Sequence, residues 1–248
     1  MTQTGLLLFV TGTDTGVGKT VLAAALARAF GDRGRRVGVL KPIETGWPDR
    51  ATDPAAPRPD GEALRAAARD PEPLEAIVPV RLPDPLAPLL AAERAGIEID
   101  GDDLARRIEE KRTRCDLLVV EGAGGLLVPI AARFGTLDLV VRTGAPVLVV
   151  AANRLGVINH AALTLACLDA ARVPVAGLAL NRVADGDDLA RSLNPGYLAR
   201  SFGARYLGEL PWQGCDAPVE RVAAALERAL DLDSLWARLV EARASRQR

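Results

Sequence analysis

The sequence is poor in several residue types that mark particular protein classes. Aromatic residues make up 4% of its 248 positions, so the core has to be built mainly from aliphatic side chains. The three cysteines, Cys115, Cys167 and Cys215, form no CxxC pair, which predicts a reduced protein without disulfides or a zinc site. The N-terminal segment has no basic stretch and no apolar run long enough for a signal peptide or a transmembrane helix. These absences favour a cytoplasmic protein with no membrane partner.

An excess of charge of one sign is also absent. Lys and Arg number 31, Asp and Glu number 32, and the formal net charge is −1. This balance does not favour nucleic acid or an anionic membrane as the main partner. Hydrophobic residues, in contrast, reach 49%, which is enough to bury a sizeable core.

Short apolar runs alternate with helix-forming segments along the chain. Buried strands are expected at 6–11, 37–40, 117–120, 147–151, 175–180 and 206–210. Helices are expected at 20–30, 61–69, 86–95, 102–113 and 159–171, with an interrupted helix at 188–202 and more helix from about residue 219. The proline-rich residues 46–60 are expected to form a mobile loop. The alternation predicts a single α/β domain over residues 1–248, with a parallel sheet covered by helices on both faces.

A glycine-rich loop separates the first apolar run from the first helical segment. Residues 12–20 read Gly-Thr-Asp-Thr-Gly-Val-Gly-Lys-Thr, and such glycines let several backbone N–H groups point at one anion. Lys19 can reach the β- and γ-phosphates of a nucleotide, and Thr20 can hold Mg²⁺. Strand, loop and helix in this order predict a P-loop NTPase-like fold. The predicted nucleotide-binding residues of the loop are Thr15, Gly16, Val17, Gly18, Lys19 and Thr20.

Two charged residues follow other apolar runs. Lys41 leaves the run 37–40 at the edge where parallel sheets bind ligands, although a solvated lysine at a strand exit is an equal alternative. Glu121 ends the run 117–120 and precedes Gly-Ala-Gly-Gly. A carboxylate there completes a Mg²⁺ site opposite the P-loop hydroxyl, and the alternative is an acid that caps the next turn.

Two further segments suit an anionic substrate group and a nucleotide base. The backbone N–H groups of Gly156, Val157, Ile158 and Asn159 precede an apolar helix and would make an anion site. Asn181, after the run 175–180, can read the N6/N7 edge of adenine or can be an ordinary turn residue. His160 is the only histidine, and we expect it to be structural rather than a catalytic base.

Together these motifs resemble those of dethiobiotin synthetases. Five segments carry the resemblance in the family's order: residues 12–20, with five residues between Gly12 and Gly18, and residues 41–46, 121–125, 155–160 and 208–211. They span residues 9 to about 212, so the resemblance covers most of the chain. It implies ATP as co-substrate, Mg²⁺ as cofactor and a homodimer with substrate at the subunit interface.

The resemblance also implies roles for single residues. Lys19, Lys41 and Thr45 would contact the reacting carbamate and phosphate, and Asn181 and Pro211 would line the base pocket. Thr45 would also contact the substrate, whose carboxylate would bind at 156–159.

An aspartate after the mobile loop would join Thr20 and Glu121 at the metal. Its best match is Asp60, although the family usually reads Asp-Ala where this chain has Asp60-Gly61. Asp49 or Asp53 would be the counterpart if the loop length differs. A helix N-cap is an equal alternative for Asp60.

The implied reaction is the ATP-dependent carboxylation and ring closure of 7,8-diaminononanoate, a diamino fatty acid, with CO2 or bicarbonate. It passes through a carbamate and a carbamic–phosphoric anhydride to dethiobiotin in biotin biosynthesis. A cobyrinate-type amidase would need an additional glutamine-hydrolysing domain, for which we expect this chain to be too short. Partition ATPases carry a second P-loop lysine, and Asp14 stands in its place here.

Overall fold

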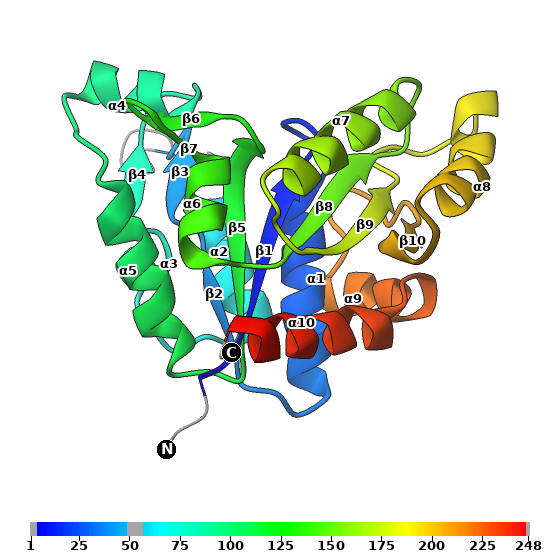
Figure 1. Cartoon of the computed structure of the whole chain (residues 1–248), viewed down its shortest axis with the longest axis horizontal. Helices are drawn as coiled ribbons and strands as arrows, with labels where there is room; N and C mark the ends of the chain where they lie inside the picture. The colour runs from blue at the N-terminus through cyan, green and yellow to red at the C-terminus, as the bar shows by residue number, and fades with distance from the viewer. Residues whose placement is uncertain (1–3, 49–56, 247–248) are drawn as a thin grey trace.

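The computed structural model describes residues 4–48 and 57–246 and is built around one parallel sheet (Figure 1). Its six strands lie in the order β10-β9-β8-β1-β5-β2, and every neighbouring pair is parallel. Their bounds are β1 Leu6–Gly12, β2 Val37–Leu40, β5 Leu117–Gly125, β8 Val147–Ala152, β9 Val175–Asn181 and β10 Tyr206–Leu210. Because β1 lies between β5 and β8, the loop that follows β1 emerges at the middle of the carboxyl edge.

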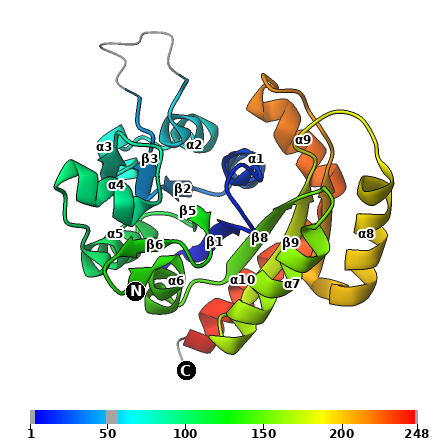
Figure 2. The same ribbon diagram turned by 90° about the horizontal axis from the view of Figure 1, so that it is seen from above.

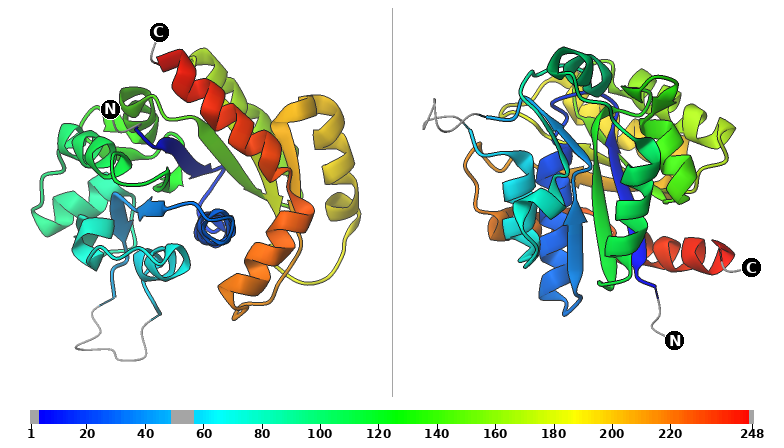
Figure 3. Two further views of the ribbon diagram at one scale, coloured as in Figure 1. Left: turned by 90° about the horizontal axis from the view of Figure 1, so that it is seen from below. Right: turned by 90° about the vertical axis from the view of Figure 1, so that its left-hand side faces the viewer.

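Helices cover both faces of this sheet (Figure 2). Their bounds are α1 Lys19–Asp32, α2 Asp60–Ala68, α3 Leu74–Ile77, α4 Pro88–Ala95, α5 Gly101–Arg112, α6 Thr136–Thr143, α7 Val157–Ala170, α8 Leu189–Phe202, α9 Val219–Ala229 and α10 Leu232–Arg246. On one face α1 packs between α2 and α9, and α10 continues from α9 along the same side (Figure 3). The predicted α/β fold class, with a helix-covered parallel sheet, is confirmed.

The alternation of side chains along β1 divides the core into two layers. Leu6, Leu8 and Val10 pack with residues of α1, α9 and α10, whereas Leu7 and Phe9 pack with residues of α5, α6 and α7. All five side chains are at most 2% exposed, as expected for a central strand covered on both faces. This buried strand gives the loop after it a rigid base.

Two small sheets lie outside the main one and were not expected from the sequence. β3 Ile43–Thr45 pairs in parallel with β4 Val80–Leu82, and β6 Pro129–Ala131 pairs with β7 Phe134–Gly135. Strands of two or three residues are too short to show a hydrophobic period. The first pair matters for the site because β3 begins two residues after Lys41.

The predicted interruption in 188–202 is wrong, because α8 runs unbroken through Pro195. A proline has no N–H to donate to the carbonyl of Arg191, one turn earlier. Asn153, just after β8, supplies that donor: its Nδ2 lies 2.9 Å from the Arg191 carbonyl oxygen. The Oδ1 of Asn153 accepts from Asn194 Nδ2 at 2.8 Å, so a buried amide pair supports the helix at the proline.

Residues 49–56 lie outside the described part of the chain, and with them Asp49 and Asp53. The mobility expected of residues 46–60 therefore stays a prediction. Among the described residues, no helix is both long and apolar enough to cross a membrane.

Candidate active site

The glycine-rich loop joins β1 to α1 at the carboxyl edge of the sheet. Gly18, the N-cap of α1, has a left-handed φ of 88°, and a Cβ there would lie 2.0 Å from Asn181 Nδ2. That same Nδ2 donates to the Val17 carbonyl at 3.0 Å. Glycine is thus required at 18 by conformation and by space, and the end of β9 holds the loop in place.

Glu121 connects the loop helix to the second lysine. Its Oε1 accepts from Thr20 Oγ1 at 2.8 Å and from Lys41 Nζ at 2.9 Å. The residue is 1% exposed and lies within β5, beside Val10 of β1. Its contacts run to α1 and to Lys41, so the alternative of an acid that caps a turn is wrong.

Lys41 lies between two carboxylates. Its ammonium also contacts the Asp60 carboxylate, which comes from the first residue of α2. Lys41 is only 5% exposed, so the solvated-lysine alternative is wrong. The N-cap of α2 is Pro59, so Asp60 is not a cap either, and its side chain points to Lys41.

The two lysines of the site have opposite electrostatic environments. Burial lowers the pKa of Lys19, and the ammonium of Lys41 adds to this against the opposing effect of Glu121. Burial alone would also lower the pKa of Lys41, yet Glu121 and Asp60 outweigh it and raise that pKa above its ordinary value. Lys19 Nζ donates a hydrogen bond to the backbone carbonyl oxygen of Asp14, in its own loop, at 3.1 Å. Lys41 is therefore firmly protonated. Lys19 forms no ion pair with a carboxylate of residues 4–48 or 57–246, so its ammonium is suited to an incoming phosphate.

The chemistry of Glu121 fits a metal ligand. Its Oε2 is buried and has no hydrogen-bond partner among the residues that the structure describes. A buried carboxylate oxygen without a donor is costly unless a cation supplies the missing interaction. Thr20 and Asp60 add the hydroxyl and the second carboxylate expected of a Mg²⁺ site, since Mg²⁺ prefers oxygen ligands.

A cleft of about 610 Å³ opens beside the loop on the α1 side. Its lining includes Gly16, Gly18 and Thr20 from the loop and first helix, and Asn181, Pro211 and Trp212 from the ends of β9 and β10. Asn181 and Pro211, the two residues predicted to line the base pocket, thus both line this cleft. Asn181 ends β9 and is 5% exposed, so it is not an ordinary turn residue.

The predicted substrate segment forms the start of α7. Gly156 is its N-cap with a φ of 95°, and Ile158 and Asn159 supply first-turn amides. The Val157 N–H bonds instead to the Arg154 carbonyl at 3.1 Å. His160 is exposed in the same turn.

Thr15 and Thr45 are the other two threonines to which the family resemblance gives a role in the site. A Cβ on Gly124 would come within 3.7 Å of Thr15 Oγ1, which places this hydroxyl beside the end of β5. Thr45 ends β3, four residues after Lys41, and is half-buried. The roles that the family resemblance implies for both threonines stay predictions.

Several residues of the site escaped the sequence analysis. Glu44 contacts the first two backbone amides of α2, and Asp14 pairs through its carboxylate with Arg154 at 3.1 Å. Glu209 accepts from Asn153 Nδ2 at 2.6 Å and from Arg182 Nε at 3.0 Å. Each of these contacts joins segments that are far apart in the chain, so no local sequence pattern predicts it.

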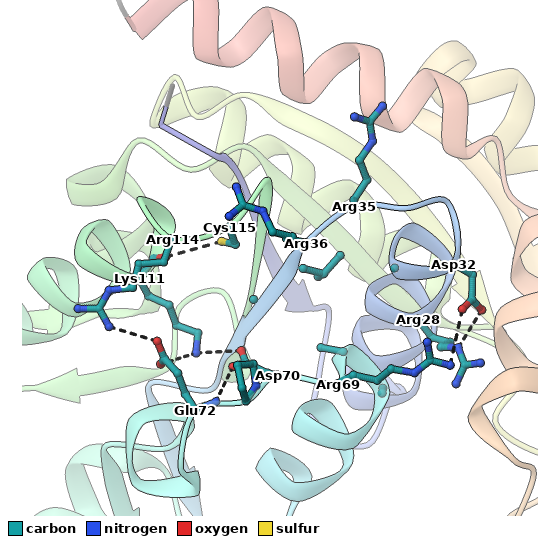
Figure 4. A pocket seen from close by; sticks show the side chains of 16 residues that line it. Arg28, Asp32, Arg35, Arg36, Arg69, Asp70, Glu72, Lys111, Arg114 and Cys115 are labelled. Atoms are coloured by element: carbon teal, nitrogen blue, oxygen red, sulfur yellow. Dashed lines mark hydrogen bonds and ion pairs between the residues drawn. The ribbon is translucent and has the colours of Figure 1, made fainter. Parts of the chain in front are cut away.

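A second cavity, of about 500 Å³, lies at the opposite edge of the sheet (Figure 4). Its cations are Arg28, Arg35, Arg36, Arg69, Arg114 and Lys111. Lys111 is buried between Asp70 at 2.9 Å and Glu72 at 2.7 Å, and Arg114 also reaches Glu72 at 3.2 Å. Burial raises the pKa of the Cys115 thiol there to about 11, so it stays protonated near neutral pH. This cavity is bounded by ion pairs that join helix ends, and it lies away from the phosphate loop.

Comparison with known proteins agrees with this geometry. A family described as an AAA domain matches residues 7–215. An ATP-dependent dethiobiotin synthetase of Anaeromyxobacter dehalogenans is 46% identical over 209 residues, which cover 83% of this chain and 90% of that protein. The chain belongs to the dethiobiotin synthetase family.

Other dethiobiotin synthetases show the same degree of coverage. That of Thermodesulfovibrio yellowstonii is 37% identical over 82% of this chain and 88% of its own. A solved structure of the signal recognition particle receptor FtsY from Elizabethkingia anophelis, in complex with GDP, aligns with a TM-score of 0.50 and 15% identity, over 91% of this chain and 64% of that one. This last likeness concerns the fold alone, and it agrees with the P-loop fold predicted from the sequence.

Proposed function

We propose that this protein is an ATP-dependent dethiobiotin synthetase, which closes the ureido ring of dethiobiotin from 7,8-diaminononanoate and CO2. The observation that carries this proposal is the buried Lys41, held between Glu121 and Asp60 next to the phosphate loop. Lys19 and Lys41 would be two cations that flank the transferring phosphoryl group and neutralise the charge that develops during transfer.

The reaction proceeds in three steps. One amine of the substrate adds to CO2, loses a proton and becomes a carbamate. A carbamate oxygen then attacks the γ-phosphorus of ATP, with ADP as leaving group, to give a carbamic–phosphoric anhydride. The second amine attacks the anhydride carbonyl, the ring closes, and phosphate leaves. None of these steps needs a cysteine or histidine nucleophile, which agrees with the protonated Cys115 and the exposed His160.

Positioning and charge neutralisation carry most of this chemistry. Lys19 would bind the β- and γ-phosphates, and Lys41 would face the oxygens that gain charge during transfer. Thr45, at the end of β3, would hold the carbamate, and the first-turn amides of α7 would bind the substrate carboxylate. The cleft with Asn181 and Pro211 would take the base, with the second N–H and the Oδ1 of Asn181 free of the Val17 contact.

Thr20, Asp60 and Glu121 would hold Mg²⁺. When bound, the ion neutralises the charge of the β- and γ-phosphates. The buried Glu121 Oε2, which lacks a donor among the described residues, supports this assignment.

We further propose that the protein works in the cytoplasm as a homodimer with substrate at the subunit interface, as the family resemblance implies. Light scattering on the purified protein should then give twice the mass of one chain. A monomer with full activity would contradict the shared site.

Product analysis tests the proposed reaction directly. Purified protein with ATP, Mg²⁺, bicarbonate and diaminononanoate should yield dethiobiotin and ADP in equal amounts by mass spectrometry. ATP turnover that ignores the diamine, or that depends on DNA or a protein partner, would contradict the proposal and favour a regulatory ATPase.

A further inference from the structure

Glu44 is a buried carboxylate that the proposed reaction does not use. It projects from β3 and is 6% exposed. Its Oε1 accepts from the Asp60 backbone N–H at 2.7 Å, and its Oε2 accepts from the Gly61 backbone N–H at 3.0 Å. Both oxygens are thus engaged by main-chain donors, and neither is directed at a reacting group.

These two donors belong to the start of α2, which has no cap of its own. The N-cap residue is Pro59, whose side chain cannot accept a hydrogen bond, so the first amides of the helix lack a local partner. A carboxylate at a helix N-terminus also interacts favourably with the helix dipole. Glu44 supplies, from a different element, the acceptor that α2 lacks.

Gly61 is what permits this approach. A Cβ at position 61 would lie 2.1 Å from Val78 Cγ2 and 3.4 Å from Glu44 Oε2. Val78 is fully buried, so it cannot move aside without disturbing the core. The Asp-Gly of this chain, in place of the Asp-Ala usual in the family, is therefore a steric requirement of how α2 is seated here.

One short segment of the chain carries both the buried cation, Lys41, and the residue that caps α2, Glu44. Lys41 precedes β3, Glu44 lies in it, and both end on Asp60: the lysine on its side chain, the glutamate on its backbone. Fixing the backbone of Asp60 fixes where its carboxylate can lie relative to Lys41 and Glu121.

We propose that Glu44 is a positioning residue for Asp60: it caps α2 from β3 and thereby sets the Asp60 carboxylate for the metal, and Gly61 makes room for that cap. The inference rests on the proposed function, in which Asp60 is a metal ligand. Groups that orient a metal ligand typically contribute 10- to 100-fold to metal affinity.

The test is a Mg²⁺ titration of the initial rate on the full chain. Glu44→Ala should raise the Mg²⁺ concentration for half-maximal rate about tenfold, while ATP affinity without Mg²⁺ stays near that of the parent. Glu44→Gln, whose amide oxygen can still accept from one N–H, should give an intermediate value.

Asp70→Asn is the matched control. Asp70 is also a buried carboxylate that accepts from backbone amides, those of Val39 at 3.1 Å and Glu72 at 3.0 Å, but at the opposite edge of the sheet. It should lower the melting temperature without moving the Mg²⁺ midpoint. If Glu44→Ala behaves in the same way, Glu44 is a structural cap only and the inference is overturned.

Further variants apply if Glu44→Ala does not fold. Gly61→Ala should then also raise the Mg²⁺ midpoint, because the added methyl group disturbs the contact between Glu44 and α2. Adding Val78→Ala should make room for that methyl group and restore the midpoint. A Gly61→Ala protein with the parent's midpoint would overturn the inference. Asp60→Asn tests the metal assignment itself. If this variant leaves the Mg²⁺ midpoint unchanged, the assignment of Asp60 as a metal ligand fails, and the inference about Glu44 fails with it. If Asp60→Asn raises the midpoint but the Glu44 and Gly61 variants do not, only the inference about Glu44 fails.

Discussion

Lys41 and Lys19 lie in one site, yet their charges affect the fold in opposite directions. A lysine whose pKa is raised by folding stabilises the protein below its ordinary pKa of 10.5, and this stability is lost as pH rises through the folded value. A lysine whose pKa is lowered destabilises the fold when charged, and the penalty disappears as pH rises towards 10.5. At neutral pH the charge of Lys41 therefore supports the fold, and the charge of Lys19 opposes it.

We predict that Lys41→Met lowers stability and turnover together. The substitution leaves the buried Glu121 carboxylate without its cation, which costs about 3–5 kcal/mol in nucleotide-free protein. The value of kcat should fall at least about 100-fold, while ATP affinity changes little, because this cation acts on charge that develops during transfer. Thermal unfolding, calorimetry and single-turnover assays measure the three quantities. Dethiobiotin formation at the parent rate would remove Lys41 from the reaction.

Lys19→Met should have the opposite effect on the free protein. We expect the nucleotide-free variant to melt at a higher temperature than the parent at pH 7, because a buried charge that opposes folding is gone. ATP binding and turnover should both be lost to a large extent. A drop in melting temperature at pH 7 would show that Lys19 stabilises the fold and would contradict this balance.

Glu121→Gln tests whether the Glu121 carboxylate is a metal ligand. The amide keeps the shape and can still accept from Thr20, but it removes the negative charge that Mg²⁺ favours. The Mg²⁺ midpoint of the initial rate should rise at least several-fold. Glu109→Gln, an ion-paired residue on the outer surface of α5, is the control and should leave that midpoint in place. Equal midpoints for the two variants would make Glu121 a structural residue.

At the scale of single elements, α8 depends on a residue outside it. Asn153→Ala removes the donor to the Arg191 carbonyl and should cost about 1–3 kcal/mol of unfolding free energy. Pro195→Ala in that background restores a backbone N–H inside the helix and should recover part of the loss. Denaturant unfolding of the two variants measures this. A double variant no more stable than Asn153→Ala would mean that the Arg191 carbonyl is not what Asn153 satisfies.

The long elements could be predicted because their sequences carry their own signals. β1 begins with five consecutive apolar residues, β8 consists of six, and α1 follows its glycine loop directly. The two small sheets and α3 have too few residues for any period. The interruption expected in 188–202 is absent, because the side chain that compensates for Pro195 lies about forty residues away in the sequence.

The same division holds within the site. Lys19 and Lys41 follow apolar strands, and Glu121 follows the apolar residues with which β5 begins, so strand order brings all three to one edge. Glu44 could not be assigned, because its partners are the backbone amides of a helix beyond residues 49–56. A carboxylate in a strand-exit motif looks solvated until the helix that it caps is placed.

At the scale of the whole molecule, nucleotide binding should be visible as stability. A ligand at 100 times its dissociation constant adds about 2.7 kcal/mol, which corresponds to a rise of about 5–10 °C in melting temperature for a chain of this size. ATP with Mg²⁺ should produce this rise in the parent, and Lys19→Met should largely abolish it. An equal rise in both proteins would place the nucleotide outside the phosphate loop.

The three tryptophans lie in different parts of the molecule, so intrinsic fluorescence can report on the occupancy of one site. Trp236 on α10 lies against Phe30 and under Arg35, and Trp47 lies under Arg81 beside β4. Trp212 alone lines the cleft proposed for the nucleotide base. Replacing Trp47 and Trp236 by phenylalanine would leave one indole, whose fluorescence emission should follow occupancy of that cleft without any attached dye.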